Sequence, residues 1–322
     1  MTWKTITPSE GARWALKHWT ATSRGVATSP WKSIPSKGTS RHNAIVEVHL
    51  DEVTAEEVRA LHSPGTAPVV IRGGARDWHA TRTWSLDWFA SHYGDHAVPT
   101  DERDSAGDTV VHPLRYCIDQ TKQGNGGYAR FSPLLQENPE LTEYLDLKHM
   151  ANLAGAPLSQ LLFQVFLGGA NTTTETHCAI GNNIFVQAHG EKIWRFVAPE
   201  FSAALQPVPT GRPYFASRAT LHDESLHTHP NAPVHAVHLH AGDILLVPPF
   251  WWHQVDNPTE SIGVAARWHH LAHAVSQSGY MSLMTLTARN PNIVRANKDR
   301  QRFGYVYQET VDQAGRPIKS AA

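Results

Sequence analysis

Two histidines in separate apolar segments have the spacing of metal ligands presented by β-strands. His177 lies in TETHCAIGNNIFVQAHGEKIWRF, which starts at residue 174, and His253 ends the apolar run of AGDILLVPPFWWHQV. Residues i and i+2 of a strand point to the same side, so a strand reading His-x-Asp can hold a metal ion from one face. A histidine from a distant strand then completes a two-histidine, one-carboxylate site on iron(II). Here Ala179 stands where that aspartate would be.

The segments around these histidines have the sequence pattern typical of β-strands. After residue 160 the chain consists of short alternating runs between turn residues: LLFQVFLGG, NNIFVQAHG, KIWRFVAP, VHAVHLHAGDILLVPP, WWHQVDN and SIGVAARWHH. Several short strands at such spacing predict an antiparallel sandwich or barrel.

The rest of the chain reads as additions to this core. We predict an N-terminal arm at 1–45, an α/β elaboration of the same domain at 46–160, the core at 161–270, and a C-terminal helical segment and tail at 271–322. Within the elaboration, Thr54 and Glu57 have the spacing of a capping box, which predicts a helix start. The helical spacing at 132–160 is interrupted by Pro139 and Pro157.

Together these segments resemble a known family. The series APVVIRGGARDW, THCAIGNNIFVQAHGEKIWRF and HAGDILLVPPFWWHQV, which spans most of the chain, is similar to the JmjC-like, cupin-8 branch of the iron(II)/2-oxoglutarate oxygenases. That branch includes the asparaginyl hydroxylase of hypoxia-inducible factor. The resemblance implies an all-β core, a cupin-like double-stranded β-helix or jelly roll, with helical additions. It also implies iron(II) bound by His177 and His253, with 2-oxoglutarate as cosubstrate.

The resemblance also implies which residues bind the cosubstrate. Thr174, three residues before the first histidine, and Lys192, fifteen after it, match the oxoglutarate-binding threonine and lysine of that hydroxylase. The Lys192 ammonium would pair with the distal carboxylate of 2-oxoglutarate, with hydroxyls from Thr174 and Tyr128 completing the hydrogen bonds. Asn183 matches a polar residue near the metal and is expected to support the ligands.

The departure at Ala179 changes the expected chemistry. A methyl group cannot bind a metal, so the site lacks one oxygen ligand and one negative charge, and a chloride or bromide ion would restore both. In other branches of the superfamily, 2-oxoglutarate halogenases carry His-x-Ala or His-x-Gly at this point. By that resemblance, oxygen converts 2-oxoglutarate to succinate and carbon dioxide, and a substrate radical takes the halogen. Halogenation of an unactivated C–H bond is the leading hypothesis.

Three alternatives stay open at this stage. Glu175 could reach the metal from the other side and complete a Glu-x-His site for ordinary hydroxylation. Water could fill the vacant position, which would also support hydroxylation. Finally, the protein could be a non-catalytic binding protein, or Ala179 could be an engineered replacement that inactivates the site. Retention of Lys192 and Thr174 argues against simple decay, because a protein without the reaction has no need for a cosubstrate anchor.

Other conspicuous residues have structural interpretations. Cys178 points away from His177 in a regular strand and is expected in the core. A histidine-rich run supplies His222, His227, His229, His235, His238 and His240. It is expected to be largely a loop, and His238 and His240, on one strand face, are the only pair in it worth testing for metal. Trp251, Trp252 and Trp268 are expected to wall the pocket or to pack beneath it.

Composition limits the remaining classes. The chain has 322 residues, 41% of them hydrophobic and 18% charged, as in ordinary folded domains. Lys plus Arg number 28 against 29 for Asp plus Glu, which provides no basic field for nucleic acid or an anionic membrane. Two cysteines and a start without a secretory signal predict a cytoplasmic protein. We expect a small-molecule substrate, no membrane segment and a possible homodimer through the C-terminal helical segment.

Overall fold

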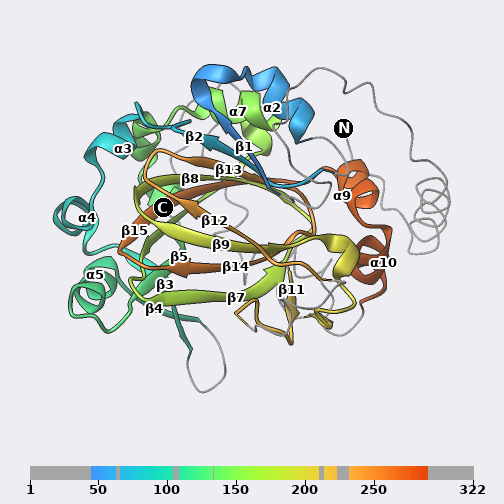
Figure 1. Ribbon diagram of the computed structural model, residues 1–322. Coiled ribbons are helices and arrows are strands. Elements are labelled where there is room, and N and C mark those ends of the chain that lie inside the picture. The colour runs from blue at the N-terminus through green and yellow to red at the C-terminus, as the bar shows by residue number, and fades with distance from the viewer. Residues whose placement is uncertain are drawn as a thin grey trace.

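The computed structural model describes residues 45–62, 66–103, 109–132, 134–209, 214–222 and 232–288. Several predicted parts lie outside these ranges: residues 1–44 of the arm predicted at 1–45, the tail from residue 289, and two histidines of the histidine-rich run, His227 and His229. Within them, the chain forms two β-sheets with helices around them (Figure 1).

One sheet has nine strands and the other has six. The larger contains β1 (Val46–His49), β2 (Val69–Arg72), β3 (Ala97–Arg103), β4 (Thr109–Pro113), β5 (Tyr128–Ser132), β6 (Leu162–Gly168), β8 (Asn182–Gly190), β13 (Ile244–Val247) and β15 (Ser261–Trp268). The smaller contains β7 (Thr172–Cys178), β9 (Lys192–Val197), β10 (Pro207–Pro209), β11 (Phe215–Ser217), β12 (His235–Leu239) and β14 (Trp252–Asn257). Their strand orders are β1-β2-β13-β8-β15-β6-β5-β3-β4 and β10-β11-β7-β14-β9-β12.

The centre of this arrangement is a jelly roll. From β6 to β9 each strand lies in the sheet opposite its predecessor, and the same alternation runs from β12 to β15. These eight strands pair as β6-β15-β8-β13 in one layer and β7-β14-β9-β12 in the other, and every pair is antiparallel. The predicted all-β core of jelly-roll type, with helical additions, is confirmed.

Side-chain alternation divides each strand between the interior of the roll and an outer face. Phe185, Trp194, Leu245 and Ala265 come from both layers and pack together between them. The opposite face of the large sheet packs in a separate cluster with helices that include α2 (Ala55–Leu61), α3 (His79–Thr83), α4 (Leu86–Tyr93), α5 (Leu114–Lys122), α6 (Leu134–Glu137) and α7 (Leu147–Ala154). Short 3₁₀ helices η1 (Leu50–Glu52), η2 (Pro139–Tyr144), η3 (Leu158–Gln160) and η4 (Pro199–Phe201) complete the connections.

The local helix signals act as the sequence indicates. Thr54 Oγ1 accepts a hydrogen bond from the Glu57 backbone N–H at 3.2 Å, and Glu57 Oε2 accepts one from the Thr54 N–H at 2.8 Å. This capping box starts α2. Pro139 opens η2 rather than continuing α6, because a proline inside a helix removes a backbone donor.

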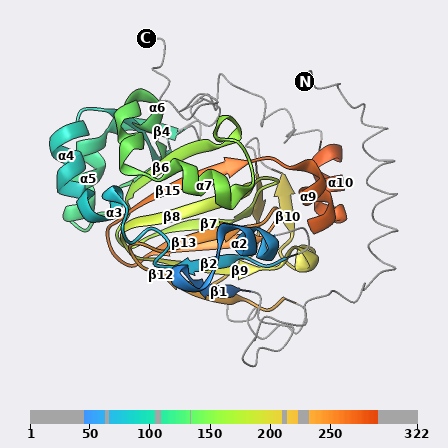
Figure 2. The same cartoon turned by 90° about the horizontal axis from the view of Figure 1, so that it is seen from above.

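The ends of the roll carry different helices. Figure 2 shows α4 and α5 at one end and α9 (Leu271–Gln277) and α10 (Gly279–Thr287) at the other. Ala274 of α9 and Met281 of α10 pack against Cys178 and Trp252 on the outer face of the small sheet. The described part of the C-terminal helical segment therefore covers the core, and Cys178 lies within that core, as predicted. The homodimer stays a prediction. None of the described helices is long and apolar enough to cross a membrane.

Candidate metal and cosubstrate site

His177 and His253 face each other inside the roll. They are directly paired across the antiparallel strands β7 and β14, and their ring centroids are 4.2 Å apart. His177 Nδ1 lies 2.7 Å from the Glu175 carbonyl oxygen, and His253 Nδ1 lies 2.8 Å from the Trp251 carbonyl oxygen. A carbonyl oxygen can only accept, so each ring carries its proton on Nδ1 and keeps the Nε2 lone pair for a metal.

The surroundings keep both rings neutral. Burial lowers the pKa of His253 to about 4, and nearby Arg267 acts in the same direction. Burial also lowers the pKa of His177 well below its usual value, followed by the effect of the neighbouring His253. A neutral imidazole is the form that binds metal ions, so the pair is held in its ligand state at neutral pH.

A β-bulge brings Thr174 to the same face as His177. His177 pairs with His253, but Thr174 pairs with Val255, so β7 has one extra residue in this interval. Val255 packs in the interior cluster, and directly opposed residues share a face of the sheet. In a regular strand, a residue three before His177 would point the other way. The bulge therefore explains how a threonine at this spacing can face the interior.

The same bulge keeps Glu175 away from the two imidazoles. Its side chain is exposed, and only its backbone carbonyl touches His177. Throughout the part of the chain that the structure describes, the one group of three or more potential metal-binding side chains is a different cluster, on the outer surface. The Glu175 carboxylate therefore does not gather with His177 and His253, and the Glu-x-His alternative is not formed.

Ala179 lies directly beyond the end of β7. Its carbonyl oxygen accepts a hydrogen bond from the Phe250 N–H at 2.8 Å, which continues the contact between β7 and the segment leading into β14. Its side chain is a methyl group and offers no ligand atom. Among the described residues, the interior histidine pair consequently has no third protein ligand of the His, Cys, Asp or Glu type.

Lys192 is a buried cation deep inside the roll. Only 1% of its surface is exposed, and its ammonium donates to Asn257 Oδ1 and, at 3.2 Å, to Tyr128 Oη. No carboxylate within the described ranges forms an ion pair with it. Burial lowers the pKa of Lys192 to about 7, with a further contribution from Arg130. A buried ammonium without a carboxylate is costly, which is why its pKa falls, and an anionic ligand bound beside it would offset that cost.

Further polar atoms inside the roll have no hydrogen-bond partner among the residues that the structure describes. They are Asn183 Oδ1 on β8, both side-chain amide atoms of Gln164 on β6, and Trp194 Nε1 on β9. Asn183 is paired with Val247, and Gln164 with Ala265, both of which contribute to the interior cluster. Buried polar groups are normally satisfied, so these atoms indicate an interior that receives a polar ligand or water.

Several residues of the site were not expected from the sequence. Asn257 joins Lys192 to Thr172, whose Oγ1 accepts from Asn257 Nδ2 at 2.9 Å. Arg130 Cζ lies 5.0 Å from the Tyr128 ring centroid, and Arg267 Cζ lies 5.1 Å from that of Phe131. These residues could have been found from their place in the strand pattern, because each lies on a strand that also carries inward-facing residues.

The three tryptophans divide between the faces. Trp251 packs in the interior cluster, while Trp252 lies on the outer face and donates from Nε1 to Ser202 Oγ at 2.8 Å. Trp268 packs in the cluster shared with the helices. Of the three, only Trp251 contributes to the interior wall.

The residues present fit the groups that the resemblance implies. Two neutral imidazoles with free Nε2 atoms suit a divalent transition metal, and a buried ammonium without a carboxylate partner suits the distal carboxylate of 2-oxoglutarate. The fit is incomplete only at Ala179, where the protein supplies no oxygen ligand.

Comparisons with known proteins show which domain family most of the chain matches. Residues 55–274 match the model of the cupin-like domain. The chain is 24% identical over 237 residues to lysine-specific demethylase 8 of Xenopus tropicalis, covering 70% of this chain and 53% of that protein. It is 25% identical over 232 residues to lysine-specific demethylase JMJ30 of Arabidopsis thaliana, covering 68% and 53%.

A third relative is the Jumonji C domain-containing protein 5 of Drosophila melanogaster, 23% identical over 237 residues, with 68% of this chain and 59% of that protein covered. The chain thus spans about half the length of the curated relatives it matches. The cupin-like match extends over most of the chain and includes both histidines and Lys192. The chain belongs to the cupin-like domain family.

Proposed function

We propose that this protein is an iron(II)- and 2-oxoglutarate-dependent oxidative enzyme that acts on a C–H bond. The observation that carries the proposal is Lys192, a buried ammonium inside the roll that donates to Tyr128 and Asn257 and forms no ion pair with any described carboxylate. A fully buried lysine without an anion is costly to the fold, and a dicarboxylate cosubstrate removes that cost on binding. The relatives named as lysine-specific demethylases agree with an oxidative enzyme.

Each interior residue then has a defined task. His177 and His253 hold the metal through Nε2 while their Nδ1 protons stay on backbone carbonyls. Lys192 and Tyr128 bind the distal carboxylate, and Thr174 adds its hydroxyl from the bulged part of β7. Asn183, whose buried Oδ1 has no hydrogen-bond partner among the described residues, would serve as a polar support. Bound together, iron(II) and 2-oxoglutarate supply the oxidising chemistry that uses dioxygen and releases succinate and carbon dioxide.

We further propose that a chloride or bromide ion occupies the position left by the missing carboxylate, which makes the enzyme a halogenase. The site has lost one negative charge at Ala179 but keeps positive charge nearby. Arg267 is close enough to lower the pKa of both histidines, and Arg130 is close enough to lower that of Lys192. In a poorly solvated interior, this excess favours a small anion at the vacant ligand position.

Hydroxylation is the second candidate function. It requires water at the Ala179 position, because Glu175 is exposed and does not join the histidines. A binding protein without catalysis, or an inactivated enzyme, would hold neither iron nor 2-oxoglutarate productively. We propose a small molecule as the substrate. We also propose that the protein acts in the cytoplasm, without binding nucleic acid or a membrane.

An anaerobic titration tests the proposal. Metal-free protein is titrated with iron(II) and 2-oxoglutarate, and the visible metal-to-ligand charge-transfer band is followed without halide, with chloride and with bromide. We expect the band to form and to shift or tighten with halide. A band indifferent to halide would overturn the halogenase proposal in favour of hydroxylation, and absence of a band would overturn the enzyme proposal.

A further inference from the structure

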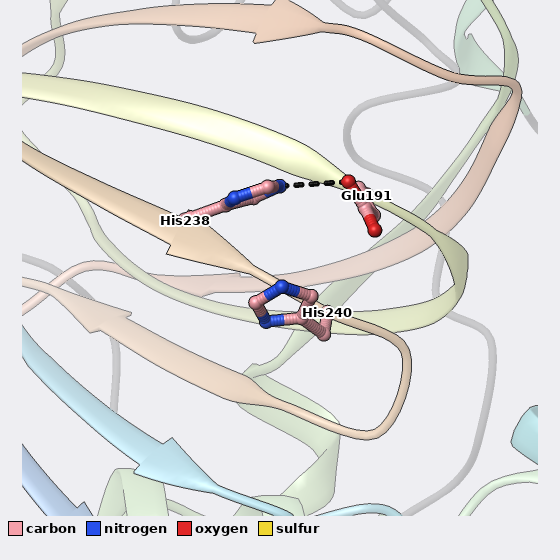
Figure 3. Close-up of side chains that lie close together, drawn as sticks. All are labelled: Glu191, His238 and His240. Carbon is pink, nitrogen blue, oxygen red and sulfur yellow. Dashed lines mark hydrogen bonds and ion pairs between the residues drawn. The ribbon is translucent and has the colours of Figure 1, made fainter.

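A second cluster with metal-ligand chemistry lies on the outer surface of the roll. It comprises Glu191, directly before β9, His238 on β12 and His240 just after β12 (Figure 3). One potential ligand atom from each residue lies within 4.8 Å of the others, and it is the sole such group found in the ranges 45–62, 66–103, 109–132, 134–209, 214–222 and 232–288. All three side chains are accessible, with 39%, 43% and 58% of their surface exposed.

We propose that Glu191, His238 and His240 form a second divalent-cation site, of the zinc class, separate from the interior histidine pair. Two imidazole nitrogens and one carboxylate oxygen are a ligand set that zinc and neighbouring transition metals favour. Three protein ligands leave one tetrahedral position for water. This inference does not depend on the proposed function, because it uses none of the interior residues.

The spacing of the ligand atoms is compatible with such an ion. His238 Nε2 lies 2.9 Å from Glu191 Oε2, and the rings of His238 and His240 have centroids 4.4 Å apart. In a tetrahedral zinc site with bonds of about 2.1 Å, ligand atoms lie roughly 3.4 Å from one another. Ligand atoms already gathered within 4.8 Å need only small side-chain rotations to reach this geometry.

The backbone around the two histidines is fixed by a buried ion pair. The Asp243 carboxylate accepts from the His240 N–H at 3.0 Å, from the Gly73 N–H at 3.0 Å and from Arg72 Nη1 at 2.6 Å. The same Arg72 nitrogen donates to the His238 carbonyl oxygen at 2.7 Å. The His238 backbone is thus attached to Arg72 of β2 directly, and the His240 backbone is attached through Asp243. This reduces the entropy lost when their side chains bind an ion.

Glu191 is positioned by a tight turn between β8 and β9. Gly190 has φ +67°, and a Cβ there would lie 1.9 Å from the Glu260 carbonyl oxygen, so only glycine fits. The Glu191 N–H donates to Thr259 Oγ1 at 3.1 Å. The next residue, Lys192, pairs with Leu239, which lies between the two histidines. An ion at the cluster would therefore link β9 to β12, which among the described strands has a neighbour on one side only.

Zinc stoichiometry of the whole 322-residue chain tests this proposal. Metal-free protein is titrated with zinc ion alone, in competition with a chromogenic chelator. We expect two equivalents for the wild type, one for the double variant H177A/H253A, and one for H238Q in the wild-type background. Loss of one ligand should weaken the zinc affinity of the surface cluster by more than about 10-fold.

A matched control is available in His112. Its Nε2 lies 3.1 Å from Glu102 Oε2, which gives a partly exposed histidine-carboxylate pair with no second histidine among the described residues. H112Q should leave the stoichiometry unchanged. The proposal would be overturned if H238Q and wild type bind equal amounts of zinc, or if H177A/H253A binds none. A wild type with one equivalent that H238Q abolishes would support the surface site and count against a metal at the interior pair.

Discussion

The two histidine pairs of this protein are built in opposite ways. The interior pair, His177 and His253, is half-buried and fixed by backbone carbonyls, and no carboxylate of the described residues lies beside it. The surface pair, His238 and His240, is exposed and has Glu191 within reach. The surface cluster thus carries its own negative charge, whereas the interior pair has Lys192 and two arginines nearby and would accept anions from solution. This difference supports our proposal that the interior binds anionic ligands as well as a metal.

The largest effect is expected at Lys192. K192M should weaken 2-oxoglutarate binding by more than about 100-fold, because it removes the charged partner of a buried carboxylate. It should leave thermal stability unchanged or raised, since an apolar side chain replaces an uncompensated buried charge. Calorimetric titration and thermal unfolding measure the two quantities.

The control for Lys192 is K122M, because Lys122 forms an exposed ion pair with Asp87. That variant should bind 2-oxoglutarate as the wild type does. If K192M unfolds more readily and still binds the cosubstrate normally, Lys192 is structural and the interior is not an anion site.

The next largest effect should follow from returning a carboxylate to the interior pair. A179D is expected to tighten iron(II) binding by more than about 10-fold and to remove any response to chloride or bromide. A179N, of similar size but without charge, should do neither. Metal titrations with and without halide would contradict this view if both variants behave alike.

A smaller effect is expected at Arg267. R267M should weaken the halide response by about 1 kcal/mol, roughly fivefold, because one positive charge near the histidines is lost. R267K should retain most of the response. Halide titrations of the charge-transfer band provide the measurement. Equal halide affinity in R267M and wild type would show that the charge of Arg267 does not contribute to halide binding.

The smallest predicted effect concerns the hydrogen-bond chain behind Lys192. T172V removes the hydroxyl that accepts from Asn257 and should cost about 0.5 kcal/mol in 2-oxoglutarate affinity, because only an indirect, uncharged hydrogen bond is lost. T173V is the matched control, since Thr173 Oγ1 donates to Asp256 Oδ1 on the outer face of the same strand. If T173V weakens 2-oxoglutarate binding as much as T172V does, the hydrogen bonds from Lys192 through Asn257 to Thr172 have no special role.

Much of the fold could be predicted from the sequence because its signals are local. The alternating runs after residue 160 correspond to β6, β8, β9, β12, β13, β14 and β15, and Thr54 with Glu57 caps α2. Cys178 is buried on the face opposite His177, as strand alternation requires. The interior residues His177, His253, Lys192 and Tyr128 could be singled out because family spacing selected them.

What could not be predicted depends on pairing between distant strands. The bulge that turns Thr174 inward is defined by its register with Val255, and no local pattern encodes that register. Asn257 and Thr172 are common residue types in strands, and only the fold places them behind Lys192. The surface histidines were noticed as a pair, but Glu191 was missed because it reaches them only through the pairing of β9 with β12.

The most direct test of the central claim is a single-turnover measurement of succinate. Protein loaded anaerobically with iron(II) and 2-oxoglutarate is exposed to dioxygen, and both acids are quantified. We predict about one succinate formed per 2-oxoglutarate lost, abolished in H253A and in K192M. Loaded wild-type protein that yields no more succinate than H253A would contradict the account.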